Sequence, residues 1–285
     1  MRRTMEIDEA ALDPLAAEWR EKLEETLQPY RRLPLLLSGG TDSATILAAL
    51  MVLNERPDCY TFQIGNHRSM DLRVAQKMCA DFDLKLTICE LDRSRNALVQ
   101  DVRTVIQMLG TSGKAAVQCA QPIMHMATRI RADGYKRAIV GTGCICLDGR
   151  QVAVVWAQEG EEAARKLRAD KHQDRHLDRG TGQMHKMAVR CGVQLEEPYT
   201  EEPVCSFGLS IDYAEMNRPK QKGIALRAYP GFWRRGYYRK NDPLQVGTGV
   251  REWHDTLLKD EELNPGGRHK AVVAIYNRMK KGMGL

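Results

Sequence analysis

The sequence contains no long hydrophobic run. No stretch approaches the roughly 20 consecutive apolar residues that a membrane-spanning helix requires. The first residues, MRRTMEIDEAALDP, also lack the apolar segment of a secretory signal peptide. From these two absences we expect a cytoplasmic protein with no membrane partner.

A disulfide framework is missing as well. The eight cysteines are scattered over 285 residues without short, regular spacings, which is typical of buried thiols in a reducing compartment. The chain shows no internal repeat and no low-complexity linker. Its formal net charge of +6 is modest and spread along the chain, so it suits an anionic ligand but does not by itself indicate nucleic acid.

Short apolar segments alternate with helical patterns along the first half of the chain. Each segment has the length of a buried strand, and the patterns between them have helical spacing. This alternation is typical of an α/β fold in which a parallel sheet carries helices on both faces. The expected strands are residues 33–37, 59–65, 85–91 and 137–141.

Individual residues predict where several helices begin and end. Ser69 is a suitable N-cap for a helix after the second strand. Gly110 is expected to end the helix that follows the third strand. Pro122 is expected in the first turn of a further helix, which ends at Gly134.

The junction between the first strand and the first helix reads Ser38-Gly39-Gly40-Thr41-Asp42-Ser43. Glycine has no Cβ and tolerates positive φ, so two adjacent glycines let the backbone approach a ligand closely. Backbone N–H groups and the positive end of the helix dipole would form an anion cradle here. Ser38 and Ser43 can donate hydrogen bonds to phosphate oxygens.

Asp42 is the residue of this loop that bare phosphate would repel. Its presence makes most sense if it holds a Mg²⁺ ion that bridges to the phosphates. The loop has neither the Gly-Lys-Ser/Thr ending of a Walker-type loop nor the dinucleotide fingerprint. The alternative is an ordinary glycine-rich turn with an aspartate helix cap. We therefore expect a site for a metal-bound polyphosphate.

Residues 38–43 resemble the Ser-Gly-Gly-x-Asp-Ser signature of the ATP pyrophosphatases, the PP-loop superfamily, which cleave ATP between the α- and β-phosphates. Within this superfamily the chain looks most like the synthetase domain of asparagine synthetase and β-lactam synthetase. The implied fold is that of the adenine nucleotide alpha hydrolases. Further similar segments follow in the same order, at residues 62–65, 69–75, 121–124, 138–143, 195–199, 222–227 and 246–250.

The resemblance implies a role for each matching residue, with ATP and Mg²⁺ as the cofactors. Lys222 would stabilise charge on the reacting phosphorus and the departing pyrophosphate; a one-residue slip in spacing leaves Lys220 as the alternative. Asp42 would hold the metal. Leu37, Ile64 and Gly141 would line the adenosine pocket, and Ser38, Gly39, Gly40, Thr41, Asp42 and Ser43 would bind the pyrophosphate end of ATP. Because this loop is expected to be exposed, Asp42→Asn should abolish activity at little cost in packing.

The second ATP-binding loop departs from the family pattern. Relatives have Gly-Glu-Gly-x-Asp-Glu, whereas this chain has Gly141-Thr142-Gly143-Cys144-Ile145-Cys146. Asp148 is the nearest carboxylate in the sequence, and we expect it to take the catalytic and metal-binding role. Otherwise the reaction uses a different nucleophile or acceptor, or catalysis is lost.

The resemblance also divides the chain. We expect residues 1–30 to form an N-terminal helical extension, residues 31–157 the PP-loop ATP-binding core, and residues 158–285 a mainly helical C-terminal part that completes the synthetase domain. Because the chain begins Met1-Arg2-Arg3 rather than with a cysteine nucleophile, we expect it to carry no glutaminase domain of its own. Nitrogen would therefore come from free ammonia, an amine substrate or a separate glutaminase subunit.

The function implied is that of an asparagine synthetase-like ligase. Its partners would be a small-molecule carboxylate and ammonia or an amine, and ATP would activate the carboxylate as its adenylate with release of pyrophosphate. One alternative is a PP-loop enzyme that modifies a base of tRNA or DNA. Another is a catalytically degenerate nucleotide-binding or interaction protein. The sequence leaves the oligomeric state open, a homo-oligomer included.

Overall fold

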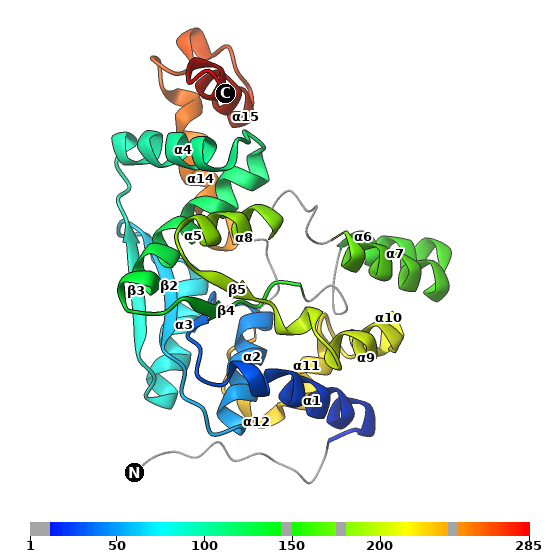
Figure 1. Cartoon of the computed structure of the whole chain (residues 1–285). Coiled ribbons are helices and arrows are strands. Elements are labelled where there is room, and N and C mark those ends of the chain that lie inside the picture. Colours follow the sequence, from blue (N-terminus) through cyan, green and yellow to red (C-terminus); the bar gives the residue numbers. More distant parts are fainter. Residues whose placement is uncertain (1–11, 144–149, 175–180, 239–243) are drawn as a thin grey trace.

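The computed structural model describes residues 12–143, 150–174, 181–238 and 244–285 (Figure 1). Within these residues a parallel sheet of five strands lies at the centre, in the order β3-β2-β1-β4-β5. The register sets Leu35 of β1 opposite Cys59 on one side and Ile139 on the other. The strands are β1 (Leu35–Leu36), β2 (Cys59–Ile64), β3 (Leu86–Leu91), β4 (Arg137–Ile139) and β5 (Gln194–Glu196).

Helices cover both faces of the sheet, so the predicted α/β fold is confirmed. Two buried apolar clusters, one for each face, hold the helices to the strands. The first cluster includes residues of α1 (Pro14–Leu27), α2 (Thr41–Val52), α3 (Met70–Phe82), α11 (Gly223–Ala228) and α12 (Pro230–Trp233). The second includes residues of α4 (Arg95–Leu109), α5 (Lys114–Ala132), α8 (Thr181–Arg190), α14 (Val250–Asp255) and α15 (Val272–Gly282).

The central strand shows how the sequence divides between the two faces. Successive side chains of a strand point to opposite sides. Leu35 and Leu37 accordingly belong to the first cluster, whereas Leu36 between them belongs to the second. Because both faces are covered, all three side chains are buried, and the sequence shows a continuous apolar run here.

Two of the predicted helix boundaries are confirmed. The hydroxyl of Ser69 accepts a hydrogen bond from the backbone N–H of Leu72 at 3.1 Å, which caps the start of α3. Helix α4 ends at Gly110, whose φ of 65° is readily adopted by glycine.

The prediction that a helix begins at Pro122 is wrong. Helix α5 begins at Lys114 and carries Pro122 in its interior. Proline costs helical stability there because it lacks an N–H group and its ring crowds the preceding turn. Burial of Val117, Ile123 and Ala127 in the second cluster favours the helix in spite of this cost.

Strand β5 has no counterpart among the predicted strands. It pairs with β4 in parallel, with Arg137 opposite Gln194 and Ile139 opposite Glu196. A strand of three residues is too short to show a periodic pattern. The sheet is therefore completed by a segment that lies beyond residue 158.

Helix α1 packs into the body of the molecule. Asp13 caps it by accepting a hydrogen bond from the N–H of Ala16 at 3.0 Å. Its inward residues Trp19, Leu23 and Leu27 are fully buried in the first cluster. Of the predicted N-terminal extension, residues 1–11 lie outside the described residues.

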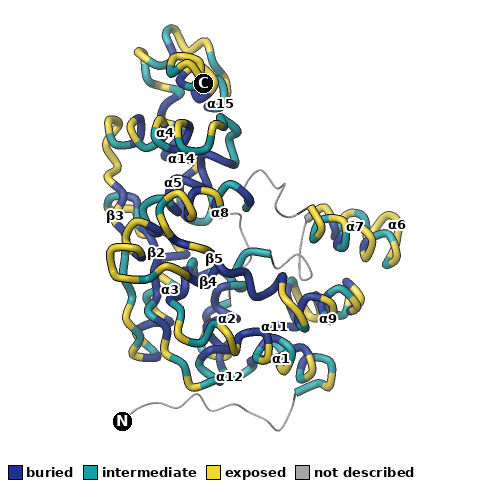
Figure 2. Tube along the Cα trace, viewed as in Figure 1, coloured by how far each residue is buried: buried dark blue, intermediate teal, exposed yellow. Residues whose placement is uncertain are grey.

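Beyond residue 157 the described chain is mainly helical, as predicted for the C-terminal part, although the predicted boundary falls inside a helix. Helices α6 (Arg150–Glu159) and α7 (Glu161–Gln173) pack on each other and stand apart from the sheet (Figure 1). Figure 2 shows many exposed residues on this pair, whereas buried residues gather around the sheet and α2. The remaining helices are α9 (Val204–Ser210), α10 (Tyr213–Met216) and α13 (Leu244–Gly247), with the 3₁₀ turns η2 (Gln28–Tyr30), η5 (Pro198–Thr200), η6 (Thr256–Lys259) and η7 (Pro265–Gly267).

Among the described residues, no helix has both the length and the apolar composition needed to cross a membrane.

Candidate functional site

The loop from β1 to α2 has the backbone geometry that its glycines predict. Gly39 adopts a φ of +77°, and a Cβ atom at this position would lie 2.2 Å from the carbonyl oxygen of Asp71. A side chain is therefore excluded by conformation and by space. Gly40 is the N-cap of α2 and offers no side-chain cap to the first turn, so the positive end of the helix dipole is directed at the loop.

Two serine hydroxyls shape this loop. The Oγ atoms of Ser38 and Ser43 share a hydrogen bond of 3.1 Å. Ser43 Oγ also accepts from the N–H of Ser38 at 3.2 Å, and Ser38 Oγ accepts from the N–H of Gly40 at 3.2 Å. The hydroxyls predicted to contact phosphate thus already lie together at the N-terminus of α2.

Asp42, in the first turn of α2, forms an ion pair with Lys222. The ammonium Nζ lies 2.7 Å from both carboxylate oxygens, although the two residues are 180 positions apart. The side chain of Lys222 is 2% exposed and that of Asp42 is 24% exposed. The ammonium offsets the negative charge that would otherwise repel phosphate from the loop.

Local backbone features aim Lys222 at this position. Lys222 adopts a φ of +60° as the N-cap of α11, and its N–H donates to Oδ1 of Asn217 at 2.9 Å. A Cβ atom on the next residue, Gly223, would lie 1.9 Å from the carbonyl oxygen of Arg218. The alternative lysine, Lys220, lies elsewhere, with its Nζ 3.7 Å from the centre of the Tyr238 ring.

The loop after β4 lies against the start of α2. A Cβ atom on Gly141 would lie 2.7 Å from the backbone nitrogen of Ser43. Only glycine therefore allows the two loops to approach this closely. Two residues further, Gly143 has a φ of +79°, and a Cβ atom on it would lie 2.3 Å from the side chain of Thr200. Asp148, predicted to serve this loop, lies outside the described residues.

A different carboxylate contacts the second loop. Glu197, which follows β5, accepts a hydrogen bond from the hydroxyl of Thr142, and its Oε1 lies 3.1 Å from Nε2 of His185 on α8. Neither Glu197 nor His185 was predicted as a site residue. Residues 195–199 resemble an Arg-Val-Pro-Phe turn of the asparagine synthetase family, and the signal that could have found Glu197 is that an acid stands there in place of the valine.

Tyr199 connects the segment after β5 to the first loop. Its hydroxyl donates a hydrogen bond of 2.9 Å to the backbone carbonyl of Asp42. The ring stacks on Trp19 of α1 with centroids 6.4 Å apart. The position of the first loop therefore depends on α1 and on the turn η5.

The structure separates two side chains predicted to line one adenosine pocket. Leu37 is fully buried in the first cluster, whereas Ile64 belongs to the second, on the other face of the sheet. Ile64 borders a cavity of about 240 Å³ at the carboxyl end of β2. The cavity is also lined by His67, Arg93, Val246, Gly249, Glu252 and Trp253. Open α/β sheets bind ligands at this edge.

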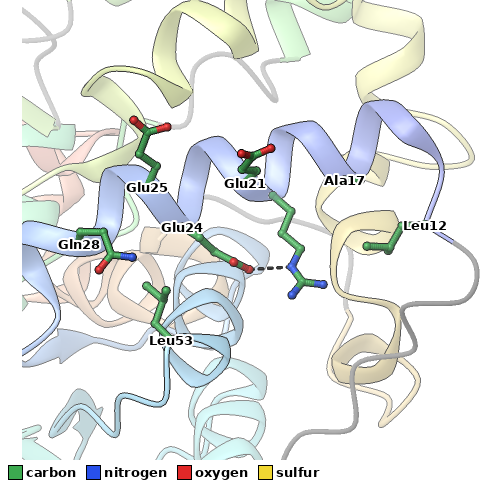
Figure 3. Close-up of a pocket in the computed structure, with 8 residues that line it drawn as sticks. Leu12, Ala17, Glu21, Glu24, Glu25, Gln28 and Leu53 are labelled. Atoms are coloured by element: carbon green, nitrogen blue, oxygen red, sulfur yellow. Dashed lines mark hydrogen bonds and ion pairs between the residues drawn. The ribbon is translucent and has the colours of Figure 1, made fainter.

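A larger hollow of about 580 Å³ runs along α1 (Figure 3). Its lining carries Glu21, Glu24 and Glu25, with Arg20 paired to Glu24 at 2.7 Å. Leu53, at the far end of α2, also borders it. A helix of 12 residues is about 18 Å long, so the end of the hollow at Leu53 is far from the first loop. The acidic lining is also unsuited to phosphate.

The first loop fits a magnesium ion that accompanies a nucleotide. Mg²⁺ is usually held by one or two carboxylates together with substrate phosphates and water. Asp42 could supply one carboxylate, and the hydroxyls of Ser38 and Ser43 are further oxygen atoms of the same loop. Among the described residues, no three His, Cys, Asp or Glu side chains gather as a metal site.

The five-stranded parallel sheet with helices on both faces is consistent with the α/β fold of the adenine nucleotide alpha hydrolases. A comparison with family models gives the narrower relationship: residues 19–144 match the model described as asparagine synthase. This segment, which is less than half of the chain, is therefore similar to the synthetase domain of the PP-loop superfamily. A search of curated proteins returned no significant match.

Proposed function

We propose that this protein joins a carboxylate to ammonia or an amine at the expense of ATP, with AMP and pyrophosphate as the other products. The observation that carries the proposal is the ion pair between Lys222 and Asp42 at the N-terminus of α2. It brings a buried cation and a carboxylate to the loop that also holds two serine hydroxyls. These are the groups that a bound triphosphate requires.

Each residue of the site has a role in this reaction. The N-terminus of α2, Ser38 and Ser43 would bind the pyrophosphate end of ATP. Lys222 would stabilise negative charge as it builds up on the departing pyrophosphate. Asp42 would hold the magnesium ion, which would neutralise phosphate charge when it is bound. Gly141 and the cavity beside Ile64 would receive the adenosine end.

The chemistry takes place in two displacements. A carboxylate oxygen of the substrate attacks the α-phosphorus of ATP; a new P–O bond forms, and the bond to the bridging oxygen breaks as pyrophosphate leaves. The nitrogen nucleophile then attacks the acyl carbon and displaces AMP, leaving an amide. The nitrogen would come from free ammonia, an amine or a separate glutaminase subunit.

The test follows pyrophosphate release from Mg-ATP in the presence of separate pools of probes. One pool contains amino acids and dicarboxylic acids, a second contains ammonium chloride and small primary amines, and a third contains total tRNA. Pyrophosphate release that requires the first two pools together supports the ligase. Release with tRNA alone would reject it in favour of base modification. Binding of ATP without turnover would instead indicate an interaction protein.

A variant of the loop tests whether the site performs this chemistry. We predict that Asp42→Asn lowers pyrophosphate release by about 100-fold or more, since it removes the metal-ligating carboxylate. Asp174→Asn is the matched control, because Asp174 is exposed at the end of α7, and it should behave as the wild type. Unchanged turnover in Asp42→Asn would contradict the proposed metal role.

A further inference from the structure

Glu197 brings a buried carboxylate to the second glycine loop. Its side chain is 5% exposed. Two of the groups that contact it are the hydroxyl of Thr142, which donates a hydrogen bond, and Nε2 of His185, at 3.1 Å. A buried carboxylate is costly unless such groups compensate its charge. The three residues come from three segments, so the folded chain assembles this cluster.

The cluster of Thr142, Glu197 and His185 is attached to the ATP loop at two points. Gly141, next to Thr142, packs against the backbone of Ser43. Tyr199, two residues after Glu197, donates its hydrogen bond to the carbonyl of Asp42. The binding of ATP, as proposed above, requires neither the carboxylate of Glu197 nor the imidazole of His185. These two side chains therefore have no assigned role in the first step.

A carboxylate beside an imidazole orients the ring and stabilises its protonated form. The side chain of His185 is 21% exposed and that of Glu197 is 5% exposed, so the imidazole is the more accessible member of the pair. Its Nε2 faces Oε1 of Glu197 at 3.1 Å. A buried carboxylate is suited to hold the ring in place, and the more exposed ring is suited to contact the substrate.

We propose that His185, positioned by Glu197, accepts the proton that the nitrogen nucleophile loses during amide formation. This inference rests on the proposed function. In that step the nitrogen lone pair forms a bond to the acyl carbon, and the acyl–oxygen bond to AMP breaks. The proton passes from nitrogen to the imidazole. His185 is then the catalytic residue and Glu197 a positioning residue.

Comparing two nitrogen nucleophiles distinguishes a proton-accepting role of His185 from a purely structural role. Ammonia and hydroxylamine are similar in size, but the nitrogen of hydroxylamine is less basic and gives up its proton to water more readily. The probes are ammonium chloride and hydroxylamine, each with Mg-ATP and the carboxylate pool. For Glu197→Gln and for His185→Gln, we expect the rate with ammonia to fall about 100-fold and the rate with hydroxylamine to change less than about threefold. Carboxylate-dependent exchange of pyrophosphate into ATP should be unchanged.

Glu196→Gln is the matched control for the neighbouring carboxylate. Glu196 pairs with Arg137 at 2.6 Å and is 11% exposed, and its variant should keep the wild-type ratio of the two rates. Thermal unfolding checks that each variant is folded; His185, being more exposed, provides the second variant if Glu197→Gln is unstable.

Three results would overturn the inference while leaving the proposed function intact. They are wild-type rates with ammonia in both variants, equal losses with both nucleophiles, and a matching loss of pyrophosphate exchange. If the wild type releases no pyrophosphate with any carboxylate, the proposed function fails, and this inference fails with it.

Discussion

At the residue scale, the two members of the Asp42–Lys222 ion pair differ in how far they are buried. Lys222 is 2% exposed, whereas Asp42 is 24% exposed. Water can solvate Asp42 if its partner is removed, but it can hardly reach Lys222. The structure therefore changes the expectation, based on an exposed loop, that Asp42→Asn costs little stability.

We predict that Asp42→Asn lowers the free energy of unfolding by about 3 kcal/mol, because it leaves a buried charge without its carboxylate. Lys222→Met keeps most of the side-chain volume and leaves only the charge of Asp42, which water can reach. It should therefore lower the free energy of unfolding by about 1 kcal/mol or less. Urea unfolding at pH 7.5 measures both variants. Equal losses, or a larger loss for Lys222→Met, would contradict this account of the pair.

The sequence predicts the parts of the site that are local. Ser38–Ser43 are contiguous, and their chemistry follows from a strand–loop–helix junction whose glycines and hydroxyls can be identified directly. The prediction of Lys222 rested on a family resemblance, which left Lys220 as an alternative. The cluster around Glu197 was not predictable from spacing, because Thr142, His185 and Glu197 meet only through the pairing of β4 with β5 and the packing of α8.

At the scale of the element, α1 supports the loop from β1 to α2 from outside the central sheet. Trp19 stacks on Tyr199, which in turn donates to the backbone of Asp42. Leu23, one turn further along, is fully buried in the first cluster. Burial of this apolar stripe stabilises the helix far more than its intrinsic propensity does.

We predict that Leu23→Ala lowers the free energy of unfolding by about 2–5 kcal/mol, as is typical when a buried leucine is truncated. Glu21→Ala, on the exposed side of the same helix, should change it by less than about 0.5 kcal/mol. Denaturant titrations of the two variants make the comparison. A loss below about 1 kcal/mol for Leu23→Ala would mean that α1 is only loosely attached.

The elements also show why the fold could be predicted only in part. The strands β2 and β3 are six residues long, which is long enough for a strand to be recognised in the sequence. The three-residue strand β5 is defined by its hydrogen bonds to β4 rather than by a pattern. Pro122 gave a local signal for a helix start, and tertiary burial of α5 overrode it.

At the scale of the whole molecule, His254 ties the C-terminal helices to the core. It lies on α14; its Nδ1 contacts the hydroxyl of Tyr276 on α15, and its Nε2 lies 2.7 Å from Oε1 of Gln121 on α5. Burial lowers the pKa of His254 to about 3; the charge of Asp101 acts in the opposite direction, and that of Lys114 lowers it further. The imidazole is thus neutral in the folded protein.

This neutral histidine makes the fold sensitive to acid. In the unfolded chain the imidazole regains its ordinary pKa of about 6.5. Between that value and about 3, the unfolded state binds one proton more than the folded state, so stability falls as the pH falls. At pH 5.5 the loss of stability from this group is about 1.4 kcal/mol relative to pH 7.5 or above.

Urea unfolding at pH 7.5, 6.5 and 5.5 measures this loss of stability in the wild type and in His254→Gln. The variant should be less stable at neutral pH, because it disturbs a buried network. Between pH 7.5 and pH 5.5, however, the variant should lose about 1.4 kcal/mol less stability than the wild type, because glutamine cannot take up the proton. Parallel declines in the two proteins would show that His254 is protonated in the folded state as readily as in the unfolded chain. Its burial between α5 and α15 would then not govern the acid response.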